Sequence, residues 1–430
     1  MNRIVESSKT LLVDGPASVM VVSGKVEVLG SLVSNTSKTI IREGKRLPFT
    51  VEEKATFDIS LGENANVEEV DGSTIPDSWD KSFDALLKIQ TTPVTVAVLG
   101  SVDSGKTSFS TYLTNRLLRE KKRVAILDGD LGQSDIGPPC TVAYAFVKKQ
   151  ITDLFNLEAE NAFFVGVTSP SSAVNKVIDG LAGLKEEILN NNPDFIIINT
   201  DGWTEGNDAA DYKHQLVEKL NPSMVICIQQ ESELAPILNT LERFTSISVE
   251  SPPATKQRNR EKRKNLRELG YIKYLRDAKV QSLPLSWIEI EDELFGLKRR
   301  YENVGHARKI YEILGMKPLH FAEFEDRICI IIGKKRWINE ERIRKVAEFT
   351  NKKITLIKKG EEEDILVALY NAEKKFLGIG ILKEVDYARK ALKIFTPVSK
   401  EISAVVFGKV KLDKNLKEIS TLDEYSQIDF

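Results

Sequence analysis

Residues 100–107 carry the strongest chemical signal in the chain. Their sequence, GSVDSGKT, matches the phosphate-binding pattern GxxxxGK[ST]. In this pattern glycines let backbone N–H groups surround phosphates, and the following helix N-terminus favours negative charge. We expect Lys106 to reach the β- and γ-phosphates of a nucleotide and the Thr107 hydroxyl to bind Mg²⁺. The predicted nucleotide-binding residues are Gly100, Ser101, Val102, Asp103, Ser104, Gly105, Lys106, Thr107 and Ser108.

ATPases, GTPases and kinases all carry this loop, and two further motifs narrow the choice. A GTPase normally has an NKxD motif, but the segment Asn351–Ile354, NKKI, has isoleucine where aspartate is required. Partitioning-type ATPases have a signature lysine where this chain has Ser101. These two absences favour a kinase or a simple ATPase.

Two acidic residues, Asp128 and Asp130, follow the apolar run at 124–127. Phosphoryl transfer needs a carboxylate that holds metal and a group that orients or deprotonates the nucleophile. Acids two residues apart at the end of a strand point to the same side. We therefore expect Asp130 to accept a proton from an attacking hydroxyl, while Asp128 or Gln133 holds metal-bound water. The alternative is a turn in which both carboxylates cap backbone amides.

The segment 256–267, KQRNREKRKNLR, has seven basic residues and one acidic residue. Most charge runs are only solvated surface, but nucleoside-type kinases often close an arginine-rich lid over the transferring phosphate. Arg258, Arg260, Arg263 and Arg267 offer more than one pair of arginines three to five residues apart, so the sequence leaves open which of them would act in such a lid. Of these, we expect Arg260 and Arg263 to face the site and to neutralise charge in the transition state.

The segments around these motifs predict a parallel sheet. A helix is expected from Lys106 to about Glu120, and most of the other apolar runs are also separated by segments of helical length. Short, continuous apolar strands alternating with helices are typical of a parallel sheet covered on both faces. The predicted strands are 94–99, 124–127, 163–167, 195–198, 224–228 and 247–249.

Two further domains are expected on either side of this sheet. Residues 1–80 contain short Val-rich runs, at 18–22, 25–29, 38–41 and 55–59, and end in the boundary-like stretch DGSTIPDSWD. Residues 306–430 contain the runs 328–332, 354–357, 365–369 and 405–410. The predicted fold class is therefore α/β: a P-loop NTPase parallel sheet in residues 81–305, with its lid near 256–267. It is flanked by an N-terminal β domain (1–80) and a small C-terminal β-rich or α+β domain (306–430).

Four motifs together resemble the polynucleotide 5′-hydroxyl kinase family of RNA processing. They are GSVDSGKT at 100–107, DGDLGQSDIGPP at 128–139, TSPS at 168–171 and NTDGW at 199–203. The family includes the kinase subunit of the pre-mRNA cleavage and polyadenylation machinery, nucleolar pre-rRNA kinases and stand-alone archaeal kinases, and the chain looks most like the last. The resemblance is strong across about residues 90–275, weaker over the N-terminal β domain and faint in the last hundred residues.

The resemblance implies roles for particular residues. Asp130 falls on the catalytic aspartate of the family's DxGQ motif and Gln133 on its glutamine, whereas some relatives have glutamate in place of Asp128. Trp203 falls on an aromatic residue that stacks on the first base. A clasp that holds the phosphate beside the reacting 5′ end corresponds to Thr168, Ser169, Pro170 and Ser171.

The chemistry of these side chains agrees with the implied roles. Hydroxyl groups can donate to a backbone phosphate, and an indole is a stacking platform that tolerates any base. The alternatives are a plain turn at residues 168–171 and a core aromatic at position 203.

Composition limits the class of protein. The 430 residues are 41% hydrophobic and 29% charged, with a net charge of −2, so a generally basic nucleic-acid-coating protein is excluded but a local basic groove is not. Cys140, Cys227 and Cys329 have no CxxC spacing, which argues against a zinc site or disulfide framework and fits a reducing cytoplasm. The charged start MNRIVESSK does not predict a secretory signal, and no apolar run is long enough to span a membrane.

The resulting hypothesis is an ATP- and Mg²⁺-dependent kinase that phosphorylates the 5′-hydroxyl end of single-stranded RNA, and of DNA. One alternative is a non-catalytic ATP-binding scaffold subunit of an RNA-processing complex. Another is an unrelated ATPase switch that acts on a protein partner. Protein partners are not indicated by the sequence.

Overall fold

The computed structural model describes residues 1–255, 258–298 and 304–421. The chain divides into two compact units, Met1–Gly270 and Tyr271–Phe430. The predicted boundary between residues 305 and 306 lies inside the second unit, because strands β15 and β16 of that unit precede it.

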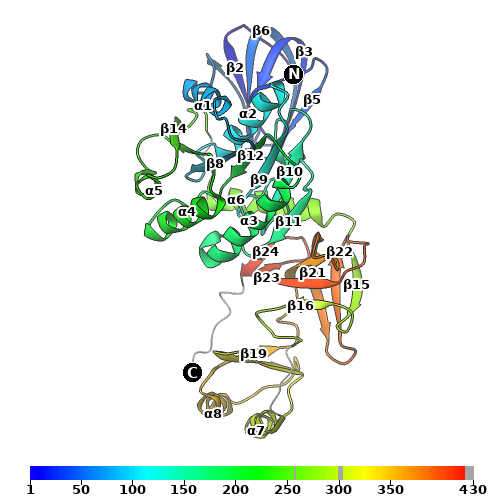
Figure 1. Cartoon of the computed structure of the whole chain (residues 1–430). Coiled ribbons are helices and arrows are strands. Elements are labelled where there is room, and N and C mark those ends of the chain that lie inside the picture. The colour runs from blue at the N-terminus through cyan, green and yellow to red at the C-terminus, as the bar shows by residue number, and fades with distance from the viewer. Residues whose placement is uncertain (256–257, 299–303, 422–430) are drawn as a thin grey trace. The chain divides into compact units, whose positions relative to one another are not determined.

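The first seven strands form an antiparallel sheet, drawn in blue in Figure 1 and here called the N-terminal β domain. Residues alternate between buried and exposed along β6, as expected of a sheet with one face on a core and one face in solvent. The predicted strands 18–22 and 25–29 form one strand, β3, whose register with β6 shifts between Val21 and Val26. The strands are β1 (Asn2–Val5), β2 (Lys9–Asp14), β3 (Ala17–Val28), β4 (Ser31–Leu32), β5 (Lys38–Ile41), β6 (Arg46–Leu61) and β7 (Val67–Asp71).

A second sheet, with strand order β11-β10-β9-β12-β8-β13-β14, forms the centre of the first unit. Strands β9, β12, β8, β13 and β14 run parallel, which confirms the predicted P-loop sheet. The antiparallel strand β10 was not expected from the sequence. The strands are β8 (Val94–Gly100), β9 (Val124–Asp128), β10 (Thr141–Val147), β11 (Asn161–Phe164), β12 (Phe195–Asn199), β13 (Met224–Gln229) and β14 (Ser246–Glu250).

Helices cover both faces of this central sheet. Ile197 of β12 packs on the side of α1 and α2, whereas the neighbouring Ile196 and Ile198 pack on the side of α3 and α4. The alternation follows from the opposite directions of successive side chains on a strand. The helices of this unit are α1 (Asp77–Leu87), α2 (Lys106–Arg119), α3 (Val174–Leu189), α4 (Asn207–Leu220), α5 (Ala235–Thr240) and the first part of α6 (Arg260–Tyr274), with short 3₁₀ turns at Leu154–Asn156 and Pro170–Ser172.

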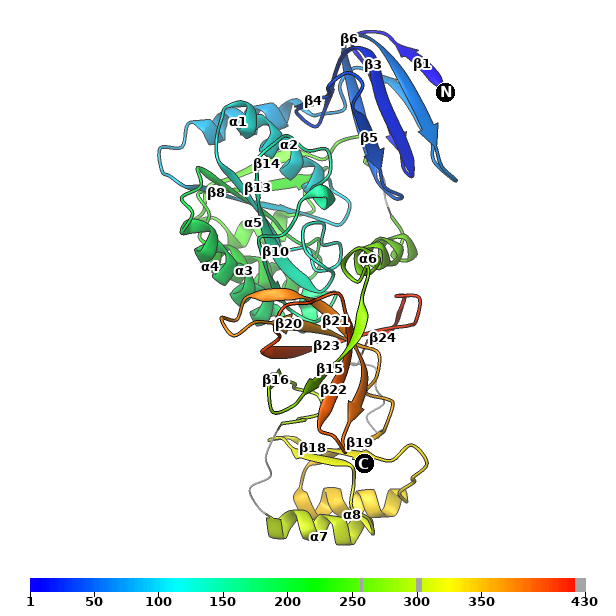
Figure 2. The same cartoon turned by 90° about the vertical axis from the view of Figure 1, so that its right-hand side faces the viewer.

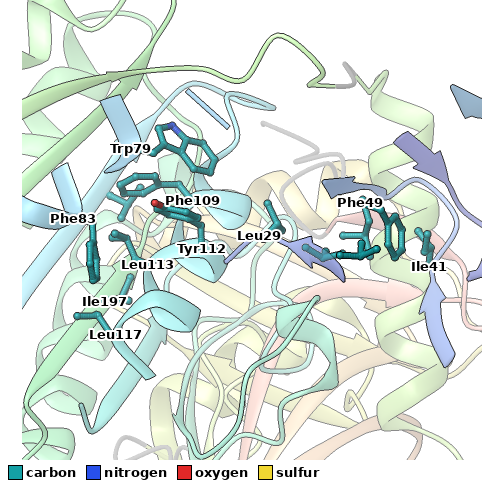
Figure 3. Packing of buried hydrophobic residues seen from close by; sticks show 14 of the residues in the cluster. Leu29, Ile41, Phe49, Trp79, Phe83, Phe109, Tyr112, Leu113, Leu117 and Ile197 are labelled. Atoms are coloured by element: carbon teal, nitrogen blue, oxygen red, sulfur yellow. The ribbon is translucent and has the colours of Figure 1, made fainter. Parts of the chain in front are cut away.

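One hydrophobic core joins the N-terminal β domain to the central sheet. Trp79 of α1 is fully buried, and the centroid of its ring lies 4.9 Å from that of Phe109 on α2 (Figure 3). The same core contains Leu29 and Phe49 of the N-terminal β domain. The predicted domain boundary at residues 80 and 81 therefore falls inside α1, within a continuous core.

The second unit has a larger sheet with strand order β15-β22-β21-β20-β23-β16, to which β24 adds. Between β16 and β20 the chain forms a separate three-stranded sheet, β17-β18-β19, with α7 and α8 packed on one face (Figure 2). The elements that lie wholly within the second unit are β15 (Lys279–Pro284), β16 (Glu289–Glu291), α7 (Val304–Leu314), β17 (His320–Glu323), β18 (Arg327–Ile332), α8 (Glu340–Thr350), β19 (Lys353–Lys358), β20 (Ile365–Tyr370), β21 (Phe376–Asp386), β22 (Ala391–Thr396), β23 (Ala404–Leu412) and β24 (Glu418–Thr421).

In the part of the chain that the structure describes, the helices are too short or too polar to cross a lipid bilayer.

Candidate active site

The phosphate-binding pattern lies where its chemistry requires, between the end of β8 and the start of α2. Gly105 has φ 101°, a left-handed conformation that glycine adopts without strain. A Cβ on Gly100 would lie 2.4 Å from the Ser104 Oγ and 3.0 Å from the Ile228 carbonyl oxygen. The loop therefore needs both glycines: one for its turn and one for its close packing.

A cavity of about 790 Å³ opens over this loop. Most of the predicted site residues line it, although they come from five separate segments of the chain. Gly100, Ser104 and Asp128 are the predicted residues that do not. Those that do are Ser101, Val102, Asp103, Gly105, Lys106, Thr107, Ser108, Asp130, Gln133, Thr168, Ser169, Pro170, Ser171, Trp203, Arg260 and Arg263.

Lys106 is buried at the base of the cavity, and its Nζ donates to the Ser101 carbonyl oxygen at 2.7 Å. Burial lowers the pKa of Lys106 to about 8, although the carboxylate of Asp130 acts in the opposite direction. A buried ammonium group with one backbone acceptor is well suited to an incoming anion, because phosphate oxygens would supply the solvation it lacks.

Asp130 lies at the cavity wall on the loop after β9. Its Oδ1 accepts hydrogen bonds from the N–H groups of Gly132 and Gln133, at 3.0 and 2.9 Å. Within the described residues its Oδ2 has no hydrogen-bond partner. Burial raises the pKa of Asp130 while Lys106 lowers it, and the pKa remains above its ordinary value. One oxygen thus fixes the loop, and the other remains available for a proton or a cation.

Asp128 lies beneath the loop and is fully buried. Its Oδ2 accepts the N–H groups of Asp135 and Ile136, at 2.8 and 3.3 Å, and its Oδ1 accepts the amide of Asn199 at 3.0 Å. Burial, together with the charges of Asp135 and Asp130, raises the pKa of Asp128 to about 7. The predicted role of Asp128 in holding metal does not match this position, because its oxygens bind the protein rather than face the cavity.

Trp203 lies on the loop after β12 and is half-buried. One face of its ring stacks on Tyr212, with 5.5 Å between the ring centroids and an interplanar angle of 22°. The indole both packs against the core and lines the cavity, so the core-aromatic alternative does not describe it fully. The stacked tyrosine fixes the plane of the ring that faces the cavity.

Asp201 also lines the cavity, but we did not single it out from the sequence. Its Oδ1 accepts the N–H of Trp203 at 2.9 Å. Its Oδ2 accepts the Tyr212 hydroxyl at 2.7 Å and lies 2.9 Å from the fully buried Lys213 Nζ. The motif NTDGW contained this residue, but its buried lysine partner is 12 positions away on α4, and no short motif shows that pairing.

The loop 168–171 is compact. The Ser169 and Ser171 hydroxyl groups are exposed and lie 2.9 Å apart, and Pro170 is buried at the start of a 3₁₀ turn. This arrangement leaves two hydroxyl groups at the cavity wall, where a phosphate can reach them.

The arginine-rich segment closes another side of the cavity. Residues 256 and 257 lie outside the described part of the chain, and α6 begins at Arg260. Arg260 and Arg263 line the cavity as expected, and so do Arg258 and Arg267. Arg258 and Arg263 both approach the Asp103 carboxylate, at 3.0 and 3.7 Å.

The N-terminal β domain supplies another wall of the cavity, through residues that were not assigned from the sequence. Apolar side chains from β2, β5 and β6 line the cavity together with Lys45 and Arg46, so one side is hydrophobic and the other charged. The apolar residues are Leu12, Ile40, Ile41, Leu47 and Pro48.

Residues 100–277 match the family model described as mRNA cleavage and polyadenylation factor CLP1 P-loop. The chain is 28% identical over 352 residues to a polyribonucleotide 5′-hydroxyl-kinase of Methanocaldococcus jannaschii, covering 80% of this chain and 94% of the relative. It is also 28% identical to a kinase of the same name from Pyrococcus abyssi, over 77% of this chain and 91% of that protein. A solved Clp1p–Pcf11p complex contains a chain of the same fold, with a TM-score of 0.67 and 13% identity over 96% of this chain and 97% of that one.

The fold and the site define a P-loop nucleotide-binding protein with the groups needed for phosphoryl transfer. Residues 100–277 match the CLP1 P-loop family model, and the resemblance to polynucleotide 5′-hydroxyl kinases noted in the sequence is confirmed.

Proposed function

We propose that this protein transfers the γ-phosphoryl group of ATP to the 5′-hydroxyl end of single-stranded RNA, and of DNA. The observation that carries the proposal is one cavity in which Lys106, Asp130, Trp203 and the arginines of the 258–267 segment meet. The archaeal relatives named polyribonucleotide 5′-hydroxyl-kinase support the same activity over most of the chain. Three free cysteines, all buried, are consistent with a place in the reducing cytoplasm.

The groups around the phosphate-binding loop fit a nucleoside triphosphate with a divalent cation. Lys106 and the N-terminus of α2 would hold the β- and γ-phosphates. The Thr107 hydroxyl is a hard oxygen donor of the kind that Mg²⁺ accepts, usually with several waters. When bound, Mg²⁺ would neutralise charge on the phosphate oxygens. The apolar wall of the N-terminal β domain offers a surface for the base of the nucleotide.

The acceptor end would lie on the opposite side of Asp130. Trp203 offers a ring face to the first base, and Ser169 and Ser171 offer hydroxyl groups to the phosphate that follows it. A 5′-hydroxyl is uncharged, so the enzyme must hold it through these neighbours. Asp130 would then accept its proton as it attacks, while Arg260 and Arg263 meet the charge that develops on the transferring group.

The variant Asp130→Asn tests the proposal, because it keeps the size of the side chain but removes the base. We expect transfer to fall by about 10²–10⁴, the usual contribution of a positioned acid–base group. ATP binding, measured separately by calorimetry, should persist. The assay follows γ-labelled phosphate onto a 5′-hydroxyl oligonucleotide, with Asp179→Asn, an acid that does not line the cavity, as the control.

The same assay separates this proposal from its two alternatives. Free phosphate without labelled oligonucleotide would indicate an ATPase, and binding without either product would indicate a scaffold. A scaffold has no use for the open Asp130 oxygen, the hydroxyl loop and the cavity-lining arginines together, so we favour the kinase.

A further inference from the structure

Arg258 lies where three separate segments of the first unit meet. Its backbone N–H donates to the Asp103 Oδ2 at 2.8 Å, and its Nη1 donates to the Asp103 Oδ1 at 3.0 Å. Its Nε donates to the Gly44 carbonyl oxygen at 2.8 Å, and Nη1 also reaches the Gln133 Oε1 at 3.2 Å. The side chain is 17% exposed and that of Asp103 is 5% exposed, so these contacts are largely shielded from water.

The three partners belong to different working parts of the site. Asp103 is in the phosphate-binding loop, Gln133 follows the Asp130 loop, and Gly44 is in the turn between β5 and β6 of the N-terminal β domain. That turn is itself anchored, because Lys45 binds the Asp135 carboxylate at 2.8 Å. Arg258 therefore ties the start of the arginine-rich segment to points that are already fixed.

The geometry at Gly44 adds a second contact with the same segment. Its φ is 75°, and a Cβ at this position would lie 3.3 Å from the side chain of Leu266 on α6. The turn thus packs closely against α6 two helical turns beyond Arg258. Backbone packing and the side-chain hydrogen bonds hold the segment at both ends.

Arg258 differs in this respect from Arg260 and Arg263. Arg260 is exposed at the cavity, with no ion-pair partner among the described residues. Arg263 donates to the Arg258 carbonyl oxygen at 2.7 Å, so its position depends on where the Arg258 backbone lies. The guanidinium of Arg258 instead uses its Nε and Nη1 donors on the buried Asp103 carboxylate and on two neutral acceptors, Gly44 and Gln133.

We propose that Arg258 is a positioning residue, which through Asp103, Gln133 and Gly44 fixes the segment 258–267 over the phosphate-binding loop. It thereby places Arg260 and Arg263 for phosphoryl transfer. This inference rests on the proposed function for its catalytic consequence. The contacts of Arg258 with Asp103, Gln133 and Gly44, here called the joint, can be tested without any reaction.

Hydrogen exchange on the full-length, nucleotide-free protein tests the joint. In Arg258→Ala we expect amides of residues 258–267 to exchange at least about tenfold faster, because the segment opens locally without global unfolding. Asp103→Ala should also speed exchange, and the double variant should gain less than the sum of the two single effects, since the two residues share one ion pair. Lys262→Ala, which removes an exposed charge of the same run, is the matched control and should not change exchange.

Steady-state kinetics tests the consequence. Arg258→Ala should lower kcat by about 10–100-fold with a smaller change in KM for ATP, because a misplaced arginine loses a contact made mainly in the transition state. Arg258→Lys should not restore the rate, since an ammonium group cannot bind Gly44, Asp103 and Gln133 in the same geometry.

The outcomes separate the possibilities. Unchanged exchange in Arg258→Ala would overturn the proposal. A rate restored by lysine, or a loss of kcat without faster exchange, would also overturn it, because Arg258 would then act on the substrate through its charge. Should the wild type transfer no phosphate, the proposed function fails, whereas the exchange experiment still decides whether the joint exists.

Discussion

Lys106 carries a positive charge that its burial disfavours. The side chain is 6% exposed, and burial lowers its pKa to about 8, compared with 10.5 in the unfolded chain. A lowered pKa means that Lys106 favours folding fully only above pH 10.5, and that this contribution is lost as the pH falls through about 8. At neutral pH the charged form is therefore a cost to the nucleotide-free protein.

We predict that Lys106→Met raises the free energy of unfolding at pH 7 by about 1–3 kcal/mol, because it keeps the bulk and removes the charge. Phosphoryl transfer should be lost. Chemical denaturation of the nucleotide-free proteins measures the difference, which should shrink towards pH 10 as the wild-type lysine becomes neutral. A methionine variant that is less stable at pH 7 would contradict this account.

Trp203 yields a prediction about the acceptor. Stacking on an aromatic ring contributes roughly 1–3 kcal/mol per base, with little dependence on the base. Trp203→Ala should therefore raise KM for 5′-hydroxyl oligonucleotides by about tenfold for all four 5′ nucleotides, and should leave KM for ATP nearly unchanged. Trp203→Phe keeps a ring that can stack on Tyr212 and should lose much less. If Trp203→Ala instead raises KM for ATP, the acceptor site lies elsewhere.

At the scale of elements, the features that could be predicted from the sequence are those formed by one uninterrupted stretch of residues. The phosphate-binding loop is one uninterrupted motif, and the buried parallel strands, such as 195–198, are uninterrupted apolar runs that need no partner to be recognised. Strand β10, TVAYAFV, was missed although its residues are nearly all buried, because it lies just after the turn-forming stretch GPPC. Strand β15, KVQSLP, was missed because it is half-exposed and lacks an apolar face.

The role of Asp128 could not be predicted because it depends on which atoms surround the carboxylate. The spacing of Asp128 and Asp130 predicted two carboxylates on one side of a strand end, and either could have held metal. Burial separates them: Asp128 binds four protein N–H groups, whereas Asp130 keeps one open oxygen. Desolvation of this kind depends on tertiary packing and is not visible in the local sequence.

We predict that Asp128→Asn folds and keeps activity within about tenfold, whereas Asp128→Ala loses about 1–3 kcal/mol because it leaves buried N–H groups without acceptors. The asparagine oxygen can take the Asp135 and Ile136 amides. Its NH₂ group can donate to the buried Oδ1 of Asn199, which has no hydrogen-bond partner among the described residues, after that amide turns over. Thermal unfolding and the transfer assay measure both variants. A metal-binding role would instead make asparagine nearly as damaging as alanine.

At the scale of the molecule, ion pairs between distant segments hold the N-terminal β domain to the P-loop sheet. Arg42 donates to both Asp135 and Asp153, at 2.7 Å each, and its guanidinium lies 3.9 Å from the centre of the Phe155 ring. Burial alone would raise the pKa of Asp135, but Lys45 and Arg42 hold it well below its ordinary value. These pairs join positions that share no motif, so we predicted the two domains but not the joint between them.

We predict that Arg42→Ala lowers the free energy of unfolding at pH 7 by about 3–5 kcal/mol, because it leaves the buried Asp153 carboxylate without its partner and Asp135 with Lys45 alone. The deficit should shrink below about pH 4, since a carboxylate with a lowered pKa contributes stability above its unfolded pKa of about 3.8 and loses it as the pH falls. Arg119→Ala breaks an exposed bridge to Glu27 between the same two parts, and should cost less than about 1 kcal/mol. Equal losses in the two variants would contradict the argument.

The order of the strands in the second unit determines how soon each strand can pair during synthesis. Strand β15 pairs with β22, and β16 with β23, while the three-stranded sheet and its helices are encoded in between. At about 5–20 residues per second, β15 leaves the ribosome roughly 100 residues, or about 5–20 s, before its partner. The intervening module can form its own core in that interval. Until their partners are synthesised, β15 (KVQSLP) and β16 (EIE) are unpaired. Their charged and polar residues then disfavour pairing with another nascent chain on the same mRNA.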